Sequence, residues 1–321
     1  MYAYSGFHIL FDTTVFTLGI VLVALHAYTV KFLDEFFQKS QIKKQFGSYV
    51  NPIIVERLQK DPSFIKLGGE KKELTVMMSD MRNFTGLGET YGDDVVAFTE
   101  TMNRYMTAIA EPILRNNGCL IKFIGDASLH VHGAPLDDIN HAKTAVRTAL
   151  EMIKAIEEFN KELVASGRPP VGMGAGVNTG ETLIGNIGAK SKFGYDVLGD
   201  SVSTAARLEG QTKSYGVLLI IGPKTAEYCK DDFPVVWLDN IAVKGKTVGL
   251  DIYTVGNTIA HMHEEYRKEY TRGNWKSAIK WAKMMVNNDG VTIKEYYHKM
   301  ILRMEDGLPA NWDGTYHATS K

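Results

Sequence analysis

The sequence contains little cysteine and almost no net charge. Its two cysteines, Cys119 and Cys229, stand far apart, which excludes a disulfide framework and a cysteine-based metal site and fits a reducing compartment. Lys and Arg number 36 against 37 Asp and Glu, so the net charge is −1, and no basic cluster is present that would bind nucleic acid. Hydrophobic residues make up 45% of the chain, as in ordinary globular proteins, so their distribution is more informative than their number.

One long run lacks formal charge, TTVFTLGIVLVALHAYTV at residues 13–30. As a helix it would be about 27 Å long, just enough to cross a hydrocarbon core. Lys31 and further lysines follow the run and none precedes it, so the following domain is expected in the cytoplasm. A buried helix and a signal peptide are the alternatives, but a signal peptide needs positive charge before its apolar core and a small-residue cleavage site after it. We therefore predict a transmembrane helix within residues 1–30, the last span of a longer sensor region in the cell (inner) membrane.

Residues 31–69 are predicted to form a juxtamembrane helix and a linker. Apolar residues recur at helical spacing from Phe32 to Phe46, although the stripe is too short and imperfect for a coiled coil. Glycine and proline pairs then punctuate the segment up to Gly69, as is typical of a linker.

Residues 70–256 alternate between strand-like and helical stretches. Adjacent strand-like runs meet at the tight polar turns Gly125-Asp126 and Thr179-Gly180, which predicts two hairpins. Hairpins require antiparallel pairing, so we expect an α+β fold with a ferredoxin-like, split βαβ core. Helices are expected near residues 94–116, 140–166, 201–215 and 223–230.

The sequence after residue 256 is helical and charged. The run EEYRKEYTRGNWKSAIKWAKMMV predicts a short helix, a Gly-Asn turn and an amphipathic helix with Trp275, Ala278 and Ala282 on one face. Residues 257–306 therefore resemble a single tetratricopeptide-like helical hairpin. Residues 307–321 form a polar tail that we expect to be loosely ordered.

The run MMSDMRNFT places Asp80 at the end of a strand, ahead of a loop with Asn83, Phe84 and Thr85. A carboxylate in this position is exposed yet rigidly held, which suits a hard cation. Backbone N–H groups in a loop ahead of a helix can receive phosphate oxygens. An aspartate that caps a helix would give the same pattern, so both interpretations stay open at this point.

The run IKFIGDASLHVHG places Asp126 at the tip of a hairpin, where turn chemistry alone would explain it. Lys122 is harder to explain. Strand alternation predicts it on the face shared by Leu120 and Ile124, where a charge must be paired or reach a ligand.

The run KFGYDVLGDSVSTAARLEG holds Asp196 among apolar and aromatic neighbours, just before the start of a helix. Arg207 lies two turns into that helix, on the face shared with Ser203. An ordinary surface arginine is the alternative. In AVKGKTVGL, Lys244 flanks a glycine between two strands, as in many solvated loops.

The order and combination of these runs resemble the catalytic domain of class III nucleotide cyclases, from Glu70 to Val255. The matching runs are SDMRNFTGLGE, KFIGDASLHVHGAP, GVNTGETLIGNIGA and YDVLGDSVSTAARLEGQTK. The upstream run KKQFGSYVNPIIVERLQKDP resembles the lead-in of bacterial, membrane-anchored members. The resemblance implies an adenylate cyclase that converts ATP into cyclic AMP and pyrophosphate.

The resemblance also implies a phosphate and metal half of the site. Asp80 and Asp126 match the family's two metal-binding aspartates, which hold two divalent cations, Mg²⁺ or Mn²⁺, and the Met81 carbonyl completes one metal site. The loop that contains Asn83, Phe84 and Thr85 matches the phosphate cradle.

The remaining residues match the nucleotide-reading half. Lys122 and Asp196 match the pair that reads adenine, whereas guanylate cyclases generally carry Glu and Cys-type residues there. Arg207 matches the transition-state arginine, and Lys244 matches a lysine that contacts the terminal phosphates. In the family, Lys122, Asp196 and Arg207 act opposite the metal aspartates of a second subunit, so the resemblance implies a homodimer with two shared sites.

One position departs from the family pattern. Ser203 stands where an asparagine usually orients the ribose, four residues before the arginine. Because serine is shorter, we expect activity to be lowered but not abolished, by about 5–150-fold for one positioning hydrogen bond.

Three alternatives differ in class or substrate. A nucleotide-binding or regulatory module that has lost turnover would keep the fold, and only Ser203 favours it. A guanylate cyclase is disfavoured by Lys122 and Asp196. A diguanylate cyclase would need a GG[DE]EF-type loop, which the sequence lacks.

Overall fold

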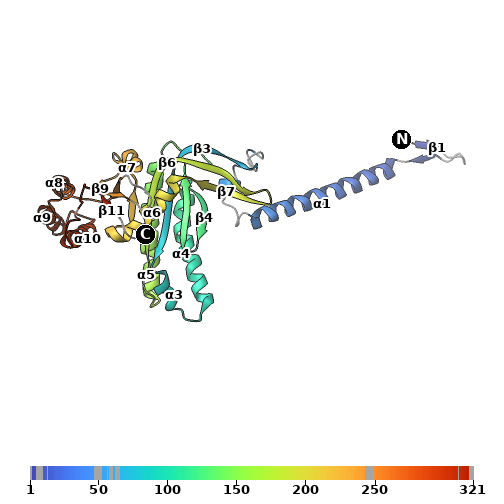
Figure 1. Ribbon diagram of the computed structural model, residues 1–321. Coiled ribbons are helices and arrows are strands. Elements are labelled where there is room, and N and C mark those ends of the chain that lie inside the picture. Colours follow the sequence, from blue (N-terminus) through green and yellow to red (C-terminus); the bar gives the residue numbers. More distant parts are fainter. Residues whose placement is uncertain are drawn as a thin grey trace. The chain divides into compact units, whose positions relative to one another are not determined.

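The computed structural model describes residues 2–4, 10–12, 14–46, 53–55, 57, 61, 66–242, 249–309 and 311–317. The chain forms two compact units, Met1–Val55 and Glu56–Lys321. In the first unit, β1 (Tyr2–Tyr4) and β2 (Leu10–Asp12) form an antiparallel pair that precedes the long helix α1 (Thr14–Phe46), shown in Figure 1.

Helix α1 contains the run that is expected to span a membrane. Its segment Thr14–Phe37 is 24 residues long and has a mean hydropathy of 1.8, and none of the residues in its most apolar stretch is buried within the chain. At ~1.5 Å per residue this segment extends about 36 Å. By length and composition it could cross a bilayer, a property that membrane spans share with signal sequences.

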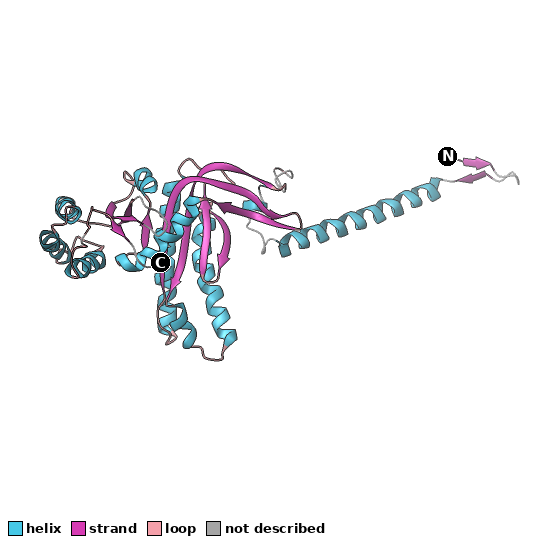
Figure 2. Cartoon of the chain, in the orientation of Figure 1, coloured by secondary structure: helices cyan, strands magenta, loops and turns pink. Residues whose placement is uncertain are grey.

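The second unit is built around a mixed sheet of nine described strands (Figure 2). The strand order is β11-β9-β10-β8-β6-β3-β5-β4, and β7 pairs with the C-terminal part of β6. The strands are β3 (Gly68–Arg82), β4 (Cys119–Ile124), β5 (Ala127–His132), β6 (Gly172–Ala189), β7 (Lys192–Leu198), β8 (Leu219–Ile221), β9 (Val235–Ala242), β10 (Leu250–Val255) and β11 (Tyr316–His317). The helices are α3 (Phe84–Glu89), α4 (Val95–Arg115), α5 (His141–Ala165), α6 (Asp200–Tyr215), α7 (Pro223–Cys229), α8 (Ala260–Thr271), α9 (Trp275–Val286) and α10 (Lys294–Glu305).

The predicted α+β, split βαβ core is confirmed. The chain runs β3-α4-β4-β5-α5-β6, and its four strands lie antiparallel in the order β6-β3-β5-β4. The helices expected near 94–116, 140–166, 201–215 and 223–230 correspond to α4, α5, α6 and α7. Apolar faces at 3.6-residue spacing explain why these segments are helical and bury one side.

The two faces of the sheet are covered by different helices. Met77 and Met81 of β3 point into a core formed with α4 and α5. Because successive strand residues alternate, Met78 and Asp80 point to the opposite face, together with their partners Gly176 and Gly174 on β6. Helix α6 covers that second face.

Helix α6 lies directly on the backbone of β6. A Cβ atom at Gly176 would be 2.1 Å from the Ala205 carbonyl oxygen and 2.3 Å from the Glu209 nitrogen, so only glycine fits there. At the start of α6, Asn178 Nδ2 donates a 2.9 Å hydrogen bond to Ser201 Oγ. These contacts fix both the height and the rotation of α6 over the sheet.

The expected hairpin at Thr179-Gly180 is wrong. These residues lie in the middle of β6, where they pair with Thr75 and Leu74 of β3. The Thr179 hydroxyl is buried and hydrogen-bonded to those of Thr75 and Thr225, both at 2.8 Å. The polar residues therefore satisfy one another inside the sheet, and the chain reverses between β6 and β7 instead.

The C-terminal region also differs from the expected helical hairpin and loose tail. Residues 257–306 contain three described helices, α8, α9 and α10, which share a hydrophobic core with β9, β10 and α6. The tail adds β11 parallel to β9, and Trp312 and Tyr316 pack against the same core. Aromatic side chains spread over all these elements favour one joint core over a separate domain.

Candidate active site on the α6 face of the sheet

Two of the predicted residues, Asp80 and Asp126, meet at one end of the sheet. Asp80 lies near the end of β3, and Asp126 lies in the turn from β4 to β5, the neighbour of β3. The strands are locked there by a 2.7 Å hydrogen bond between the buried hydroxyls of Ser79 and Ser128. The Met81 backbone N–H donates to Asp80 Oδ1 at 3.0 Å, which fixes the carboxylate. The structure thus brings together the two aspartates that the resemblance assigns to one metal site.

The charge environment of Asp80 is repulsive. Burial and the neighbouring Asp126 carboxylate raise the pKa of Asp80 above its ordinary value, against the hydrogen bond from the Met81 N–H, which lowers it. A cation placed beside both carboxylates would relieve the repulsion. The described residues contain no cluster of three or more His, Cys, Asp and Glu side chains with metal-binding geometry. Ligands beyond the two aspartates would have to come from backbone carbonyls, such as that of Met81, from water or from a substrate.

The predicted phosphate loop follows directly. Asn83 adopts a left-handed backbone conformation with φ of 67°, and α3 begins at Phe84. The Phe84 ring packs on Phe98 of α4, with ring centroids 5.8 Å apart, and Thr85 is exposed in the first turn. The loop is therefore anchored by an aromatic contact, while its first turn remains open to solvent.

Lys122 and Asp196 form an ion pair, with 2.5 Å between Lys122 Nζ and Asp196 Oδ2. Asp196 lies on β7, and its second oxygen accepts a 2.8 Å hydrogen bond from the Val197 N–H. The two residues are 74 positions apart in the sequence. The structure thus brings together the two residues that were assigned to one recognition pair.

The expectation that Lys122 shares a face with Leu120 is wrong. The β4-β5 register shifts between these residues, so that Leu120 pairs with His130 and Lys122 pairs with Leu129. The irregularity turns Lys122 away from the α4 and α5 core, onto the face that carries Asp80. Its charge therefore stays partly exposed and finds Asp196.

Helix α6 carries the last described group. Ser203 is exposed and Arg207, one turn later, is half-buried. Lys244, the remaining predicted residue, lies outside the described residues.

Sequence reasoning missed Glu209, which lies close to Asp80. Its Oε1 is 2.6 Å from the point that a Cβ atom of Gly174 would occupy, and Gly174 pairs with Asp80. Burial, with the charges of Asp80 and Asp126, raises the pKa of Glu209 to about 7, and nearby Arg82 opposes the shift. The available signal was its position in the run ARLEG, two residues after Arg207 on the same helix.

Arg207 and Glu209 lie on different sides of α6. Two residues along a helix correspond to a rotation of about 200°, so Arg207 points away from the side on which Glu209 approaches Asp80. The Cα–Cβ bonds of Arg207 and Glu209 therefore leave α6 on nearly opposite sides.

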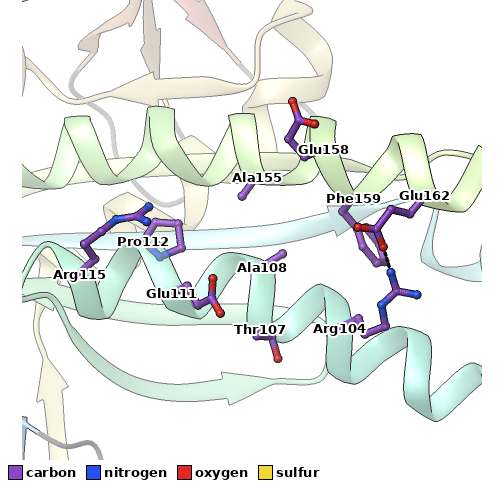
Figure 3. Close-up of a pocket in the computed structure, with 10 residues that line it drawn as sticks. All are labelled: Arg104, Thr107, Ala108, Glu111, Pro112, Arg115, Ala155, Glu158, Phe159 and Glu162. Carbon is purple, nitrogen blue, oxygen red and sulfur yellow. Dashed lines mark ion pairs between the residues drawn. The ribbon is translucent and has the colours of Figure 1, made fainter.

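A groove of about 440 Å³ lies elsewhere, between α4 and α5 on the opposite face of the sheet (Figure 3). Arg104 of α4 and Glu162 of α5 form an ion pair across it. None of the predicted site residues lines this groove.

Comparison with known proteins agrees with this arrangement. Residues 69–261 match the adenylate and guanylate cyclase catalytic domain family, so the chain belongs to that family. It is 32% identical over 211 residues to adenylate cyclase 1 of Rhizobium meliloti, covering 65% of this chain and 31% of the relative. It is 28% identical over 232 residues to the adenylate cyclase of Anabaena cylindrica, covering 70% of this chain and 43% of the relative. The chain therefore spans less than half the length of these curated relatives.

Solved structures show the same fold. The adenylyl cyclase CyaB from P. aeruginosa is 30% identical, with a TM-score of 0.54, and the match covers 59% of this chain and 96% of that one. The guanylyl cyclase Cya2 is also 30% identical, with a TM-score of 0.52 over 59% of this chain and 94% of that one.

The charge environment of Glu209 leads to a first prediction. Its folded-state pKa of about 7 lies above the ordinary value of 4.5. Between these two pH values the carboxyl group is protonated in the folded protein and ionised in the unfolded chain. Stability is therefore present below pH 4.5 and is lost as the pH rises through 7. We expect Glu209→Gln to stabilise the metal-free protein by about 1–3 kcal/mol at pH 8, allowing for partial exposure, and by much less at pH 5.

Urea unfolding in the presence of a chelator at both pH values measures this difference. Glu89→Gln, a change at an exposed residue of α3, serves as the control. An equal gain from Glu209→Gln at pH 5 and pH 8 would contradict the assigned charge environment.

Proposed function

We propose that the chain is an adenylate cyclase that converts ATP into 3′,5′-cyclic AMP and pyrophosphate at shared sites of a homodimer. The Lys122–Asp196 ion pair carries the assignment to ATP, because it stands where the family reads the base. In this pair an Asp196 oxygen can accept a hydrogen bond from the exocyclic amino group of adenine. Lys122 holds that carboxylate in place and can donate to a ring nitrogen.

Asp80 and Asp126 would hold two divalent cations, Mg²⁺ or Mn²⁺, with the Met81 carbonyl as a further ligand. The fit rests on the repulsion that raises the pKa of Asp80 in the absence of a cation. Bound there, the cations would lower the pKa of the ribose 3′-hydroxyl and neutralise charge on the phosphates during in-line attack on the α-phosphorus.

The other residues position the nucleotide and stabilise charge. The first turn of α3, with Asn83, Phe84 and Thr85, presents backbone N–H groups to the phosphates. Arg207 would stabilise the charge that develops on the α-phosphoryl oxygens, an interaction realised mainly in the transition state. Lys244 would contact the terminal phosphates. Few protein groups transfer protons in this scheme, so the rate depends on positioning and electrostatics.

Two observations support the homodimer. Arg207 leaves α6 on the side away from Glu209 and Asp80, so a second copy would bring the two sets together. Apolar side chains two residues from Lys122 and Asp196, on the same strand faces, are also exposed: Ile124 is 49% exposed and Leu198 48%. A second copy on this face would cover them and complete two equivalent sites.

Helix α1 would anchor the enzyme. Its segment Thr14–Phe37 suits a span of the cell (inner) membrane, and the lysines that follow it support a catalytic domain on the cytoplasmic side. In this organisation residues 1–30 hold the span, 31–69 the linker, 70–256 the cyclase domain and 257–321 the C-terminal helices and tail.

The activity itself is tested by identifying a product. Full-length protein in detergent, incubated with Mn²⁺ or Mg²⁺ and either ATP or GTP, should form cyclic AMP from ATP, as measured by chromatography and mass spectrometry. Asp80→Asn should abolish the product and weaken Mn²⁺ binding. Preferential formation of cyclic GMP would assign a guanylate cyclase instead. Nucleotide binding without any product would assign a regulatory module that has lost turnover.

Shared sites predict complementation between two inactive chains. Asp80→Ala and Arg207→Ala should each be inactive alone, because each removes one half of both sites. A random equal mixture should recover about one quarter of wild-type activity, since half of the dimers are mixed and each has one intact site. Steady-state cyclase assays on co-expressed chains measure this recovery, and its absence would argue for sites contained in single chains.

Ser203 predicts a gain of activity. Asparagine at this position would reach the ribose with a longer amide, so Ser203→Asn should raise kcat by about 5–150-fold. Because Ser203 is exposed on α6, the change should leave the unfolding midpoint in place. Unchanged turnover in Ser203→Asn would show that the ribose is positioned by other groups.

A further inference from the structure

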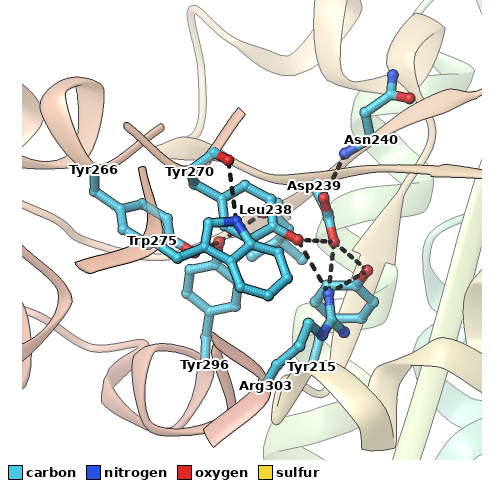
Figure 4. Close-up of polar contacts among 9 residues, drawn as sticks. All are labelled: Tyr215, Leu238, Asp239, Asn240, Tyr266, Tyr270, Trp275, Tyr296 and Arg303. Atoms are coloured by element: carbon cyan, nitrogen blue, oxygen red, sulfur yellow. Dashed lines mark hydrogen bonds and ion pairs between the residues drawn. The ribbon is translucent and has the colours of Figure 1, made fainter. Parts of the chain in front are cut away.

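A buried charged cluster joins the C-terminal helices to the helix that carries Arg207 (Figure 4). At its centre is Asp239 of β9, which is fully buried. Its Oδ2 accepts hydrogen bonds from Tyr215 Oη at 2.6 Å, Arg303 Nη1 at 2.7 Å and Tyr270 Oη at 3.2 Å. Its Oδ1 accepts a 2.8 Å bond from the Asn240 N–H. Four elements, α6, β9, α8 and α10, therefore meet at one carboxylate.

The cluster also fixes the orientation of the Arg303 guanidinium. Arg303 of α10 is almost buried, and its guanidinium lies 4.6 Å from the ring centre of Tyr215 and 3.8 Å from that of Tyr316. Arg303 Nη1 also lies 3.2 Å from Tyr215 Oη. A planar guanidinium held between two rings and a carboxylate permits one arrangement of α10 relative to α6.

Helix α10 also lies against the end of α6. Tyr215 is the last residue of α6, and Gly216, which ends the helix, has a left-handed φ of 64°. A Cβ atom at Gly216 would be 2.7 Å from Glu295 Cγ and 3.0 Å from the Glu295 carbonyl oxygen. The last turn of α6 is thus fixed from both its side chain and its backbone, two turns beyond Arg207.

The apolar core alone would hold the C-terminal helices in place. Replacing a buried ion pair by apolar residues of similar volume is often neutral or stabilising, so stability does not explain the cluster. The hydrogen bonds of the cluster instead fix the positions of α6 and β9 relative to α8 and α10. Helix α6 also carries Arg207, so the cluster fixes the end of the helix that bears the proposed transition-state arginine.

We propose that Arg303 is a positioning residue for catalysis. Through Asp239 and Tyr215, it aligns α6 and so aims Arg207 at the phosphates of the shared site. The inference rests on the proposed function and deepens it. The C-terminal helices then belong to the nucleotide-reading half of each site and not to the half that holds Asp80.

Arg303→Lys and Tyr215→Phe test the alignment in the full chain. Both keep the size and burial of the side chain but weaken the fixed contact with Asp239. We expect kcat to fall by about tenfold, because small misplacements of a catalytic group are costly. The KM for ATP should change less than about twofold, since Lys122 and Asp196 lie outside the cluster.

Tyr297→Phe is the matched control. It removes a buried 2.8 Å hydrogen bond between Tyr297 of α10 and His263 of α8, within the C-terminal helices. If loss of stability alone lowered kcat, this variant would lower it as well. A fall in kcat equal to that of Arg303→Lys would overturn the proposal, as would unchanged kcat in both Arg303→Lys and Tyr215→Phe.

Complementation assigns the defect to one half of the site. Mixed dimers of Arg303→Lys with Asp80→Ala should contain one fully active site, because the nucleotide-reading half of that site comes from the Asp80→Ala chain. Mixed dimers of Arg303→Lys with Arg207→Ala should contain no fully active site. Equal recovery in both pairings, or better recovery with Arg207→Ala, would overturn the proposal.

Hydrogen exchange provides a readout that does not require activity. Arg303→Lys should increase amide exchange in the last turn of α6 and in β9, and Tyr297→Phe should not. Unchanged exchange in α6 would overturn the coupling even in an active enzyme. If the exchange changes as expected but the wild-type protein forms no cyclic nucleotide, the coupling stands and the proposed function fails.

Discussion

The placement of α6 on the bare backbone of β6 determines how the site is divided. At Gly176 the backbone of α6 leaves no room for a side chain, and at Gly174 the side chains of Glu209 and Thr212 fill the space, so the helix approaches the sheet closely. The rotation of α6 brings Glu209 to the side of Asp80 and turns Arg207 to the opposite side. A bulkier residue in β6 would lift the helix and change both relations together. The separation of anionic and cationic groups is therefore a consequence of packing before it is a matter of chemistry.

Repulsion between carboxylates of one chain also bears on how the proposed site is assembled. Burial and mutual repulsion raise the pKa values of Asp80 and Glu209, which lie on the same face. Lys122, the proposed base-reading cation, forms an ion pair with Asp196. Lys122 therefore does not neutralise the carboxylates around Asp80. In the proposed dimer, divalent cations and the nucleotide phosphates would lie between the carboxylates of one chain and the cationic residues of the other.

The sequence predicted the core because local signals and global fold agreed there. Strand and helix patterns with the Gly125-Asp126 turn suffice for the split βαβ core. Thr179-Gly180 misled, because buried threonine hydroxyls that bond to one another look like a polar turn in a single sequence. The face of Lys122 was missed because a register shift cannot be read from alternation. Glu209 was missed because its proximity to Asp80 depends on the rotation of α6, which is a tertiary property.

The C-terminal helices show the same limit of prediction from local sequence patterns. A single helical pair read from the sequence looks like an independent module, since nothing local shows that Tyr215, Asp239 and Arg303 meet. Once they do, the buried carboxylate ties the helices to the cyclase core more specifically than apolar packing could. The proposed enzyme then has two sets of site residues in each chain, the carboxylates of Asp80 and Asp126 and the residues that position Arg207. Because one set from each chain builds each site, turnover depends on the alignment of two protomers, and a signal can alter the rate without touching any catalytic residue.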